Sequence, residues 1–269
     1  MTEFLNDLPM REYHKLDRLS SSQIKNLLRS RKYWEAQLAR PNKATPDMVI
    51  GTAIHSLLLT PDQLSQEVAI APADGCSTRT TKAYKEWAAE QSPDKALLLN
   101  KEWQQAKAAA DHVRKHPHWG QYLDNLEGAE GTVLWDEDEA IHCKARIDGW
   151  FKVDGKYYLL DVKTCQNATT THSGEGRPFH YIAWDYGYHV QLAWYRRGWQ
   201  KCVGEVAGCL ILAVEKHAPH TVRLFDMDQW LEYGDKLIDQ ALANYNDDPE
   251  ITSVTTLPLP GWAKYQETA

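Results

Sequence analysis

The sequence reads IHCKARIDGWFKVDGKYYLLDVKT over residues 141–164, with β-branched and aromatic residues on both sides of Asp154-Gly155. An Asp-Gly pair between two extended runs is typical of a two-residue hairpin turn, because both central residues must adopt positive φ. Such a turn fixes the register of the two strands and places Val153 opposite Lys156.

Two acidic side chains meet across this hairpin. Counting outward from the turn places Asp148 opposite Asp161 and Arg146 opposite Lys163. Directly opposed Cβ atoms lie ~5 Å apart, and two carboxylates that close repel each other unless a proton or a cation lies between them. Lys163 points to the same side of the strand as Asp161. The hairpin therefore predicts a divalent-metal site beside a lysine, as in a nuclease.

The composition indicates a globular protein with a full core. The chain has 269 residues, 43% of them hydrophobic and 11 of them Trp, and we expect a single domain with insertions. No apolar leader and no apolar run of membrane-spanning length are present, so we expect a soluble protein with no membrane partner. Five scattered cysteines without a C-x-x-C pair favour reduced thiols in a cytoplasm. A net charge of −7 argues against nonspecific coating of nucleic acid, so we expect any DNA contact to be local, through a basic groove.

The remaining pattern predicts an α/β fold with a mixed central β-sheet flanked by helices. We expect helices at 23–40, 47–59, 80–90, 101–115 and 181–198, and strands at 67–72, 131–137, 203–216 and 221–225 in addition to the hairpin. The polar stretch 165–180 directly follows Lys163 and is expected to be a mobile loop beside the site. The expected organisation is a helical N-terminal part with an insertion over about 20–127, a catalytic core over about 128–247 and an extended C-terminal tail over about 248–269.

Four local signals occur in order along the chain. They are Gly51-x-x-x-His55, Asp148, Asp161-Val162-Lys163 and Gln191-x-x-x-Tyr195. With the phrases RIDGWF, LLDVKT and YGYHVQLAWY, they resemble the RecB-family branch of the PD-(D/E)xK nucleases, and most closely the RecE-type (exonuclease VIII-like) phage exonucleases, over about residues 19–214. Asp161 stands where many members of this family have Glu, and either carboxylate can ligate a metal.

The resemblance implies a role for each of these residues. The implied ligands of Mg²⁺ or Mn²⁺ are His55, Asp148, Asp161 and the main-chain carbonyl of Val162. Lys163 would be the catalytic lysine, acting as a base or as a stabiliser of developing charge, and the sequence does not choose between these roles. Gln191 and Tyr195 would contact the DNA strand near the scissile phosphate, from one face of a helix.

Further residues are candidates for binding DNA. Arg29 and Arg31 could bind phosphate oxygens, including a 5′-terminal phosphate. Glu130 could ligate the metal or position the DNA end. Ser30 stands where the iron–sulfur subset of the family has a cysteine, and no cysteine cluster lies near the C-terminus, so we expect no iron–sulfur cluster.

Most of these signals also have a purely structural interpretation. A D-x-K triplet is common on solvated strands, and a histidine on an apolar helix is often a hydrogen-bonded core residue. Gln191, Tyr195, Arg29 and Arg31 could be ordinary helix residues. Three tryptophans near the last motif could stack on bases as in a single-strand binder, although their helical spacing is more typical of a core: Trp184, Trp194 and Trp199.

The function expected from the resemblance is that of a Mg²⁺-dependent hydrolase, an exonuclease that degrades one strand of linear double-stranded DNA from its end, 5′ to 3′. The overhang would serve recombination through a single-strand annealing protein, and the family implies a phage or prophage origin and a homo-oligomeric ring around DNA. One alternative is a structure-specific endonuclease or repair nuclease on the same fold. Another is a noncatalytic module that binds DNA or a partner, which the presence of Asp148, Asp161 and Lys163 argues against.

Overall fold

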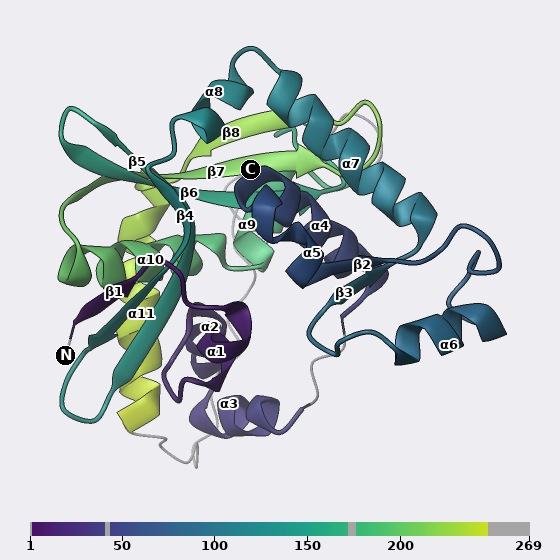
Figure 1. Ribbon diagram of the computed structural model, residues 1–269. Helices are drawn as coiled ribbons and strands as arrows, with labels where there is room; N and C mark the ends of the chain where they lie inside the picture. The colour runs from purple at the N-terminus through teal and green to yellow at the C-terminus, as the bar shows by residue number, and fades with distance from the viewer. Residues whose placement is uncertain (1, 41–43, 172–175, 247–269) are drawn as a thin grey trace, which may run out of the picture.

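A six-stranded mixed β-sheet forms the centre of the computed structural model, which describes residues 2–40, 44–171 and 176–246 (Figure 1). The strands, in their order across the sheet, are β1 (Glu3–Leu5), β4 (Gly128–Asp136), β5 (His142–Val153), β6 (Lys156–Cys165), β7 (Val206–Glu215) and β8 (Val222–Asp226). β6 and β7 are parallel, and the other neighbouring strands are antiparallel. The predicted α/β fold with a mixed central sheet is confirmed.

The β5–β6 hairpin has the predicted register near its turn. The strands pair from the turn as far as Gly149 opposite Leu160. Asp154 and Gly155 have φ angles of 50° and 78°, as a two-residue turn that matches the strand twist requires.

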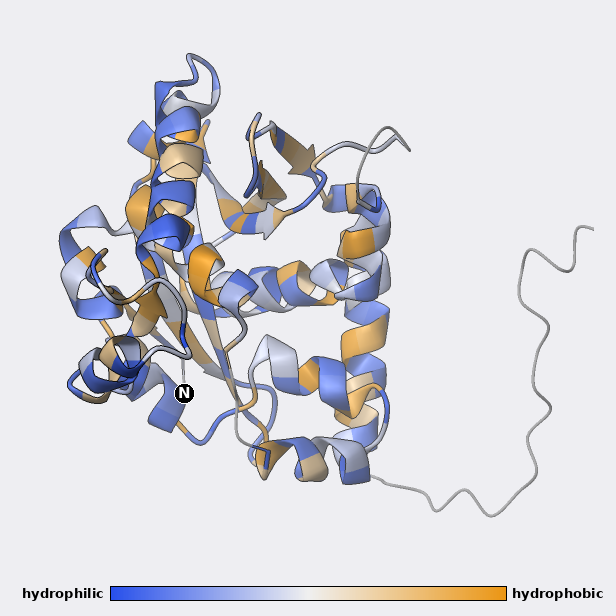
Figure 2. Ribbon diagram, turned by 90° about the vertical axis from the view of Figure 1, so that its right-hand side faces the viewer, coloured by the Kyte–Doolittle hydropathy of each residue, from blue (hydrophilic) through white to orange (hydrophobic). Residues whose placement is uncertain are grey.

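Helices cover both faces of the sheet and create one core on each side. The first core contains side chains of α2 (Ser21–Leu27), α10 (Tyr188–Cys202) and α11 (Asp228–Asn246), and the second contains those of α4 (Pro46–Leu59) and α7 (Asn100–Lys115). Because successive strand residues point to opposite faces, Leu159 packs in the first core and Leu160 in the second. In Figure 2 each helix carries both hydrophobic and hydrophilic residues, as expected for helices with one face on a sheet and the other in solvent.

The other elements are short. They are α1 (Met10–Lys15), α3 (Arg31–Leu38), the 3₁₀-helix Pro61–Gln63, α5 (Leu64–Glu67), β2 (Val68–Ile70), α6 (Lys82–Ala89), β3 (Ala96–Leu98), α8 (Trp119–Asp124) and α9 (Phe179–Asp185). β2 and β3 form a separate two-stranded parallel sheet, so the insertion before the main sheet is not wholly helical.

Two segments that were each predicted to be one helix contain two helices. The helix expected over 23–40 is divided into α2 and α3, because the Ser30 side chain accepts a hydrogen bond from the Tyr33 N–H at 3.0 Å and starts a new helix. The helix expected over 181–198 is divided into α9 and α10 by Gly187, whose φ of 63° is left-handed.

One long helix was missed. In α11 the buried residues Leu231, Ile238 and Leu242 recur at helical spacing, a pattern that could have predicted it. The expected tail over 248–269 lies outside the described residues, as do residues 172–175 of the expected loop. Within the described part of the chain, no helix is long and apolar enough to cross a bilayer.

Candidate active site

Three neighbouring strands bring acidic residues together, with Asp148 in the middle strand β5. The pairs on either side of it in the β4–β5 ladder place Glu130 opposite Asp148. Glu130 has a φ of 58°, which is uncommon for a non-glycine residue and marks a local distortion of the strand. On the other side the β5–β6 ladder stops one step before Asp148 and Asp161. There Asp148 Oδ2 accepts a hydrogen bond from the Val162 N–H at 2.8 Å, so a carboxylate replaces a strand-to-strand contact.

Helix α4 supplies a histidine to this acidic pair. A Cβ atom at Gly51 would lie 3.0 Å from Thr164 Oγ1, so the missing side chain lets the helix approach β6 closely. One turn later, His55 Nδ1 lies 3.0 Å from Glu130 Oε1 and His55 Nε2 lies 2.8 Å from Asp148 Oδ2. Both imidazole nitrogens therefore face carboxylate oxygens.

The ionisation of these groups is coupled. Burial acts to lower the pKa of His55, but the carboxylates of Asp148 and then Glu130 outweigh it and raise this pKa well above its ordinary value. Burial acts to raise the pKa of Asp148, but His55 first and Lys163 next hold it below its ordinary value. The cluster is thus a buried pair of carboxylates that faces two cations, the His55 imidazolium and the Arg146 guanidinium bound to Glu130.

His55, Glu130 and Asp148 can hold a metal ion together. Each offers one ligand atom, and these atoms lie within 4.8 Å of one another. Carboxylate oxygens suit Mg²⁺ or Mn²⁺, and an imidazole nitrogen is a common ligand of divalent transition metals. Glu130 is also held in place, because the Arg146 guanidinium binds its second carboxylate oxygen. Outer contacts of this kind orient metal ligands.

Asp161 and Lys163 form the adjoining half of the site. Asp161 is fully buried. Its Oδ2 forms an ion pair with Lys163 Nζ at 2.5 Å, without the angles of a hydrogen bond. Its Oδ1 accepts a hydrogen bond from Gln191 Nε2 at 3.2 Å, and the same nitrogen donates to Tyr195 Oη at 2.7 Å. Burial raises the pKa of Asp161 to about 6 despite Lys163. Burial acts to lower the pKa of Lys163, but Asp161 and then Asp148 raise it above its ordinary value.

The geometry differs from the predicted ligand set in two respects. Among the described residues, Glu130 completes the group with His55 and Asp148, whereas Asp161 lies outside that 4.8 Å group. The main-chain group of Val162 that contacts the site is its N–H, which donates to Asp148. Ligation by Asp161 and by the Val162 carbonyl stays a prediction.

The predicted arginines make other contacts. Arg29 lies 4.3 Å over the ring of Tyr33, and Arg31 donates to Glu35 and to the main-chain oxygen of Tyr245. Neither belongs to the lining of the cavity in front of the metal group. Their role in binding a phosphate therefore stays a prediction that this geometry does not support.

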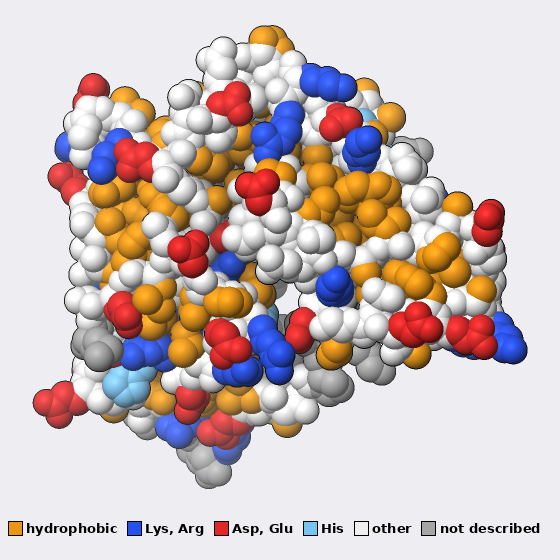
Figure 3. Space-filling view, viewed as in Figure 1, with side chains coloured by type: hydrophobic (Ala, Val, Ile, Leu, Met, Phe, Trp, Pro, Cys, Tyr) orange, Lys and Arg blue, Asp and Glu red, His pale blue; other side chains and the backbone are white. Residues whose placement is uncertain are grey.

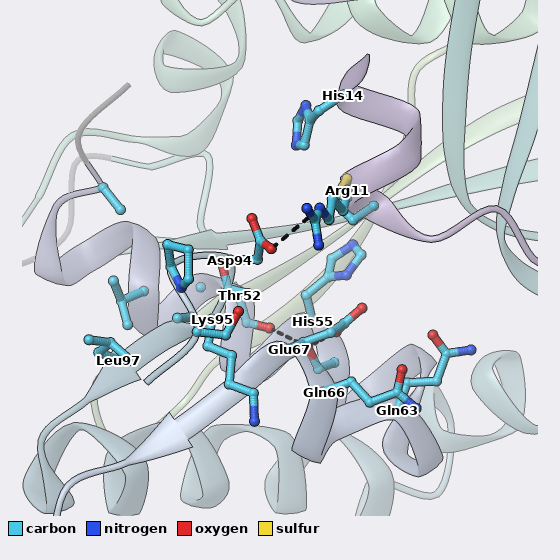
Figure 4. A pocket seen from close by; sticks show the side chains of 18 of the residues that line it. Arg11, His14, Thr52, His55, Gln63, Gln66, Glu67, Asp94, Lys95 and Leu97 are labelled. Atoms are coloured by element: carbon cyan, nitrogen blue, oxygen red, sulfur yellow. Dashed lines mark hydrogen bonds and ion pairs between the residues drawn. The ribbon is translucent and has the colours of Figure 1, made fainter. Parts of the chain in front are cut away.

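A cavity of about 960 Å³ lies in front of the site, lined by His55, Glu130 and Lys163. Its other walls come from α1, from the Arg79 region and from the segment before β3, and Figure 4 shows Arg11 and Asp94 facing each other there. Their side chains form an ion pair at 3.8 Å. Figure 3 shows this face hollowed between α1 and the β2–β3 sheet, with basic and acidic side chains at the rim.

Sequence reasoning missed these wall residues. Arg11, Arg79 and Lys95 line the cavity, yet they come from separate segments with no motif around them. Only the tertiary structure brings them to one place. The cavity wall therefore mixes cations with acidic residues, and the local basic groove expected for DNA stays a prediction.

One solved structure has a similar fold. The crystal structure of a "Putative exonuclease" from Eubacterium rectale superimposes with a TM-score of 0.60 at 15% identity, covering 98% of each chain. SSO0001 matches with a TM-score of 0.29 at 13% identity, covering 84% of this chain and 86% of that chain. Protein VC1899 from Vibrio cholerae matches with a TM-score of 0.27 at 8% identity, covering 91% of this chain and 57% of that chain. No curated protein matches the sequence. Residues 20–254 match a family described as a PDDEXK-like domain of unknown function (DUF3799). Because this match spans most of the chain, the protein belongs to that PDDEXK-like family, within the PD-(D/E)xK nuclease superfamily.

Proposed function

We propose that this protein is a metal-dependent nuclease that hydrolyses phosphodiester bonds in DNA. The observation that carries the proposal is the grouping of His55, Glu130 and Asp148 within 4.8 Å, beside the buried Asp161–Lys163 ion pair. The two halves are joined, because Asp148 accepts the N–H of the residue between Asp161 and Lys163. Membership of a PDDEXK-like family supports the same chemistry.

The metal would be held by His55, Glu130 and Asp148, with Asp161 as a further predicted ligand. Bound Mg²⁺ or Mn²⁺ would polarise a phosphoryl oxygen and lower the pKa of a water molecule. The protein fixes the ligands by outer contacts: Arg146 holds Glu130, and a main-chain N–H holds Asp148.

Lys163 supplies the positive charge next to the metal group. Its side chain is 17% exposed and lines the cavity, so a phosphate in the cavity can reach it. Because Asp161 and Asp148 raise its pKa, Lys163 is protonated at neutral pH in this state. A fixed ammonium at this position favours stabilisation of developing negative charge over proton abstraction.

Gln191 contacts Asp161 directly, and Tyr195 contacts Gln191. Gln191 donates to Asp161 Oδ1 and to the Tyr195 hydroxyl, so both oxygens of the Asp161 carboxylate have a partner, Oδ1 with Gln191 and Oδ2 with Lys163. Burial foremost, and then Asp161 and Asp148, raise the pKa of Tyr195 well above its ordinary value, so its hydroxyl stays neutral. Direct contact of these two residues with the DNA strand remains part of the proposal that rests on the family resemblance.

The finer proposal is an exonuclease of the RecE type, acting 5′ to 3′ on one strand of linear duplex DNA for strand annealing. Its support is the resemblance in RIDGWF, LLDVKT and YGYHVQLAWY. A homo-oligomeric ring, a phage origin and an annealing partner belong to the same proposal. A structure-specific endonuclease on this fold is the second candidate.

Digestion of end-labelled linear DNA tests both levels of the proposal. The duplex is labelled at the 5′ or the 3′ end, carries a 5′-phosphate or a 5′-hydroxyl, and is incubated with Mg²⁺ or Mn²⁺ and with EDTA as the control. We expect metal-dependent release of nucleotides from one strand of linear DNA and no attack on covalently closed circles. Cleavage of closed circles would replace the exonuclease with an endonuclease, and no hydrolysis with either metal would refute the nuclease.

A further inference from the structure

A second cavity, of about 480 Å³, has an aromatic rim that is open to solvent. Trp184, Tyr186 and Tyr233 line it and are 52%, 64% and 45% exposed. Trp184 on α9 and Tyr233 on α11 have rings inclined by only 15°, with centroids 5.4 Å apart. His189 lies on Trp184 at 4.9 Å with an angle of 18°. Trp184 and Tyr233 thus present aromatic surface to solvent, whereas His189 is only 4% exposed. Exposed apolar surface of this kind marks an interaction site.

Trp184 differs in its exposure from the two other tryptophans near the Gln191-x-x-x-Tyr195 motif. Trp194 and Trp199 are fully buried in the first core, whereas Trp184 is half exposed. Helical spacing therefore indicated core packing for two of the three residues, and the third is free to meet a ligand.

The aromatic rim continues to the active-site cavity. Tyr186, which lines the second cavity, stacks on Tyr188 at 6.0 Å with an angle of 17°. Tyr188 lines the first cavity, and Lys163 Nζ lies 5.1 Å from its ring centroid. An aromatic path therefore leads from the second cavity to the proposed catalytic lysine.

One cation lines the second cavity. Lys25 of α2 lines it and donates from Nζ to the main-chain oxygen of Tyr186 at 3.1 Å. Among the described lining residues the one carboxylate is Asp185, which is ion-paired with Arg177. Burial first and Lys25 next lower the pKa of His189, so its ring is neutral at pH 7. A cation beside uncharged flat rings complements a polymer of bases joined by phosphates.

We propose that this second cavity binds single-stranded DNA, with Trp184 and Tyr233 stacking on bases and Lys25 facing the backbone. Every base has a flat face that can stack on an aromatic ring, whereas in a duplex these faces are covered by neighbouring bases. The strand would then pass over Tyr186 and Tyr188 to Lys163. This inference rests on the proposed nuclease function, since it places the strand next to the cut site.

Binding of a fluorescein-labelled oligothymidylate, followed by fluorescence anisotropy in EDTA, tests the inference without hydrolysis. We expect Trp184→Ala to weaken binding by about 5- to 150-fold, the range for loss of one base–aromatic stack. Trp184→Phe keeps a flat ring and should retain most of the affinity. The control is Tyr181→Ala, since Tyr181 lies on the same helix, is 40% exposed and does not line the cavity.

Thermal unfolding of each variant, with Tyr233→Ala as a second probe, separates loss of the stack from loss of the fold. Equal affinity of wild type, Trp184→Ala and Tyr233→Ala for the oligonucleotide would overturn the inference, even if the wild type hydrolyses DNA. Trp184-dependent binding by a chain that hydrolyses nothing would keep the inference and refute the proposed function. A dimer that Trp184→Ala dissociates, with unchanged oligonucleotide binding, would show that a second copy covers this surface and would also overturn it.

Discussion

Replacement of Asp148 by Asn tests the metal site with the smallest change of shape. The Asn side chain can still accept the Val162 N–H, which Asp148 Oδ2 accepts at 2.8 Å. It loses the negative charge that faces His55 Nε2 at 2.8 Å. We therefore expect Asp148→Asn to fold and to lose metal affinity.

The size of the effect follows from linkage between binding and unfolding. At a Mn²⁺ concentration of about 100 Kd, the wild type gains about 2.7 kcal/mol in free energy of unfolding. A chain of this size shifts by about 2–4 °C per kcal/mol, so we expect Tm to rise by roughly 5–10 °C. Loss of a direct ligand should cost at least the roughly 100-fold in affinity that outer contacts can cost. The same Mn²⁺ concentration would then stabilise Asp148→Asn by about 0.4 kcal/mol, or roughly 1 °C.

The assay is thermal unfolding by circular dichroism, with and without Mn²⁺. Glu139→Gln is the control, because Glu139 is an exposed carboxylate in the β4–β5 connection and its loss should leave the full shift. Asp161→Asn measures whether Asp161 also ligates the metal. A wild-type shift in Asp148→Asn, with an unchanged metal-free Tm, would refute the proposed ligand set.

Three further predictions concern the groups around the metal. Lys163→Met should lower kcat by about 10²–10³-fold, the cost of removing one charge-stabilising donor, while the Mn²⁺ shift in Tm persists; steady-state kinetics with wild-type kcat would contradict its role. Gln191→Ala removes the hydrogen bonds to Asp161 and Tyr195 and should lower kcat by about 10–100-fold, and an unchanged rate would show that Asp161 needs no such support. Because the pKa of His55 is raised, Mn²⁺ must displace its proton, so the affinity measured by calorimetry should fall by up to about tenfold per pH unit as the pH drops below that pKa. An affinity independent of pH between about 6 and 8 would indicate that His55 is not a ligand.

Much of the fold could be predicted because its signals are local. The Asp154-Gly155 turn fixed the register of the hairpin, and this register is observed as far as Gly149 opposite Leu160. The breaks at Ser30 and Gly187 were missed because the apolar spacing continues through each of them. Periodicity reports which side chains are buried, and it is less sensitive to one residue of non-helical backbone.

The site was predicted only in part because register over a longer connection is not fixed locally. Strands β4 and β5 are joined through residues 137–141, and no two-residue turn sets their pairing. The position of Glu130 opposite Asp148 therefore follows from packing of the whole sheet. Arg146, expected opposite Lys163, instead binds Glu130.

The sequence by itself determined the mixed α/β fold and the β5–β6 hairpin, with Asp148 on one strand and Asp161 and Lys163 on the other. Turn chemistry and the alternation of side chains act between near neighbours in the chain, so these features are encoded locally. Only the tertiary structure decided that Glu130 and His55 face Asp148 from β4 and α4, and that Trp184 is exposed beside Tyr233. Those contacts join segments far apart in sequence, and their geometry is set by the packing of helices on the sheet.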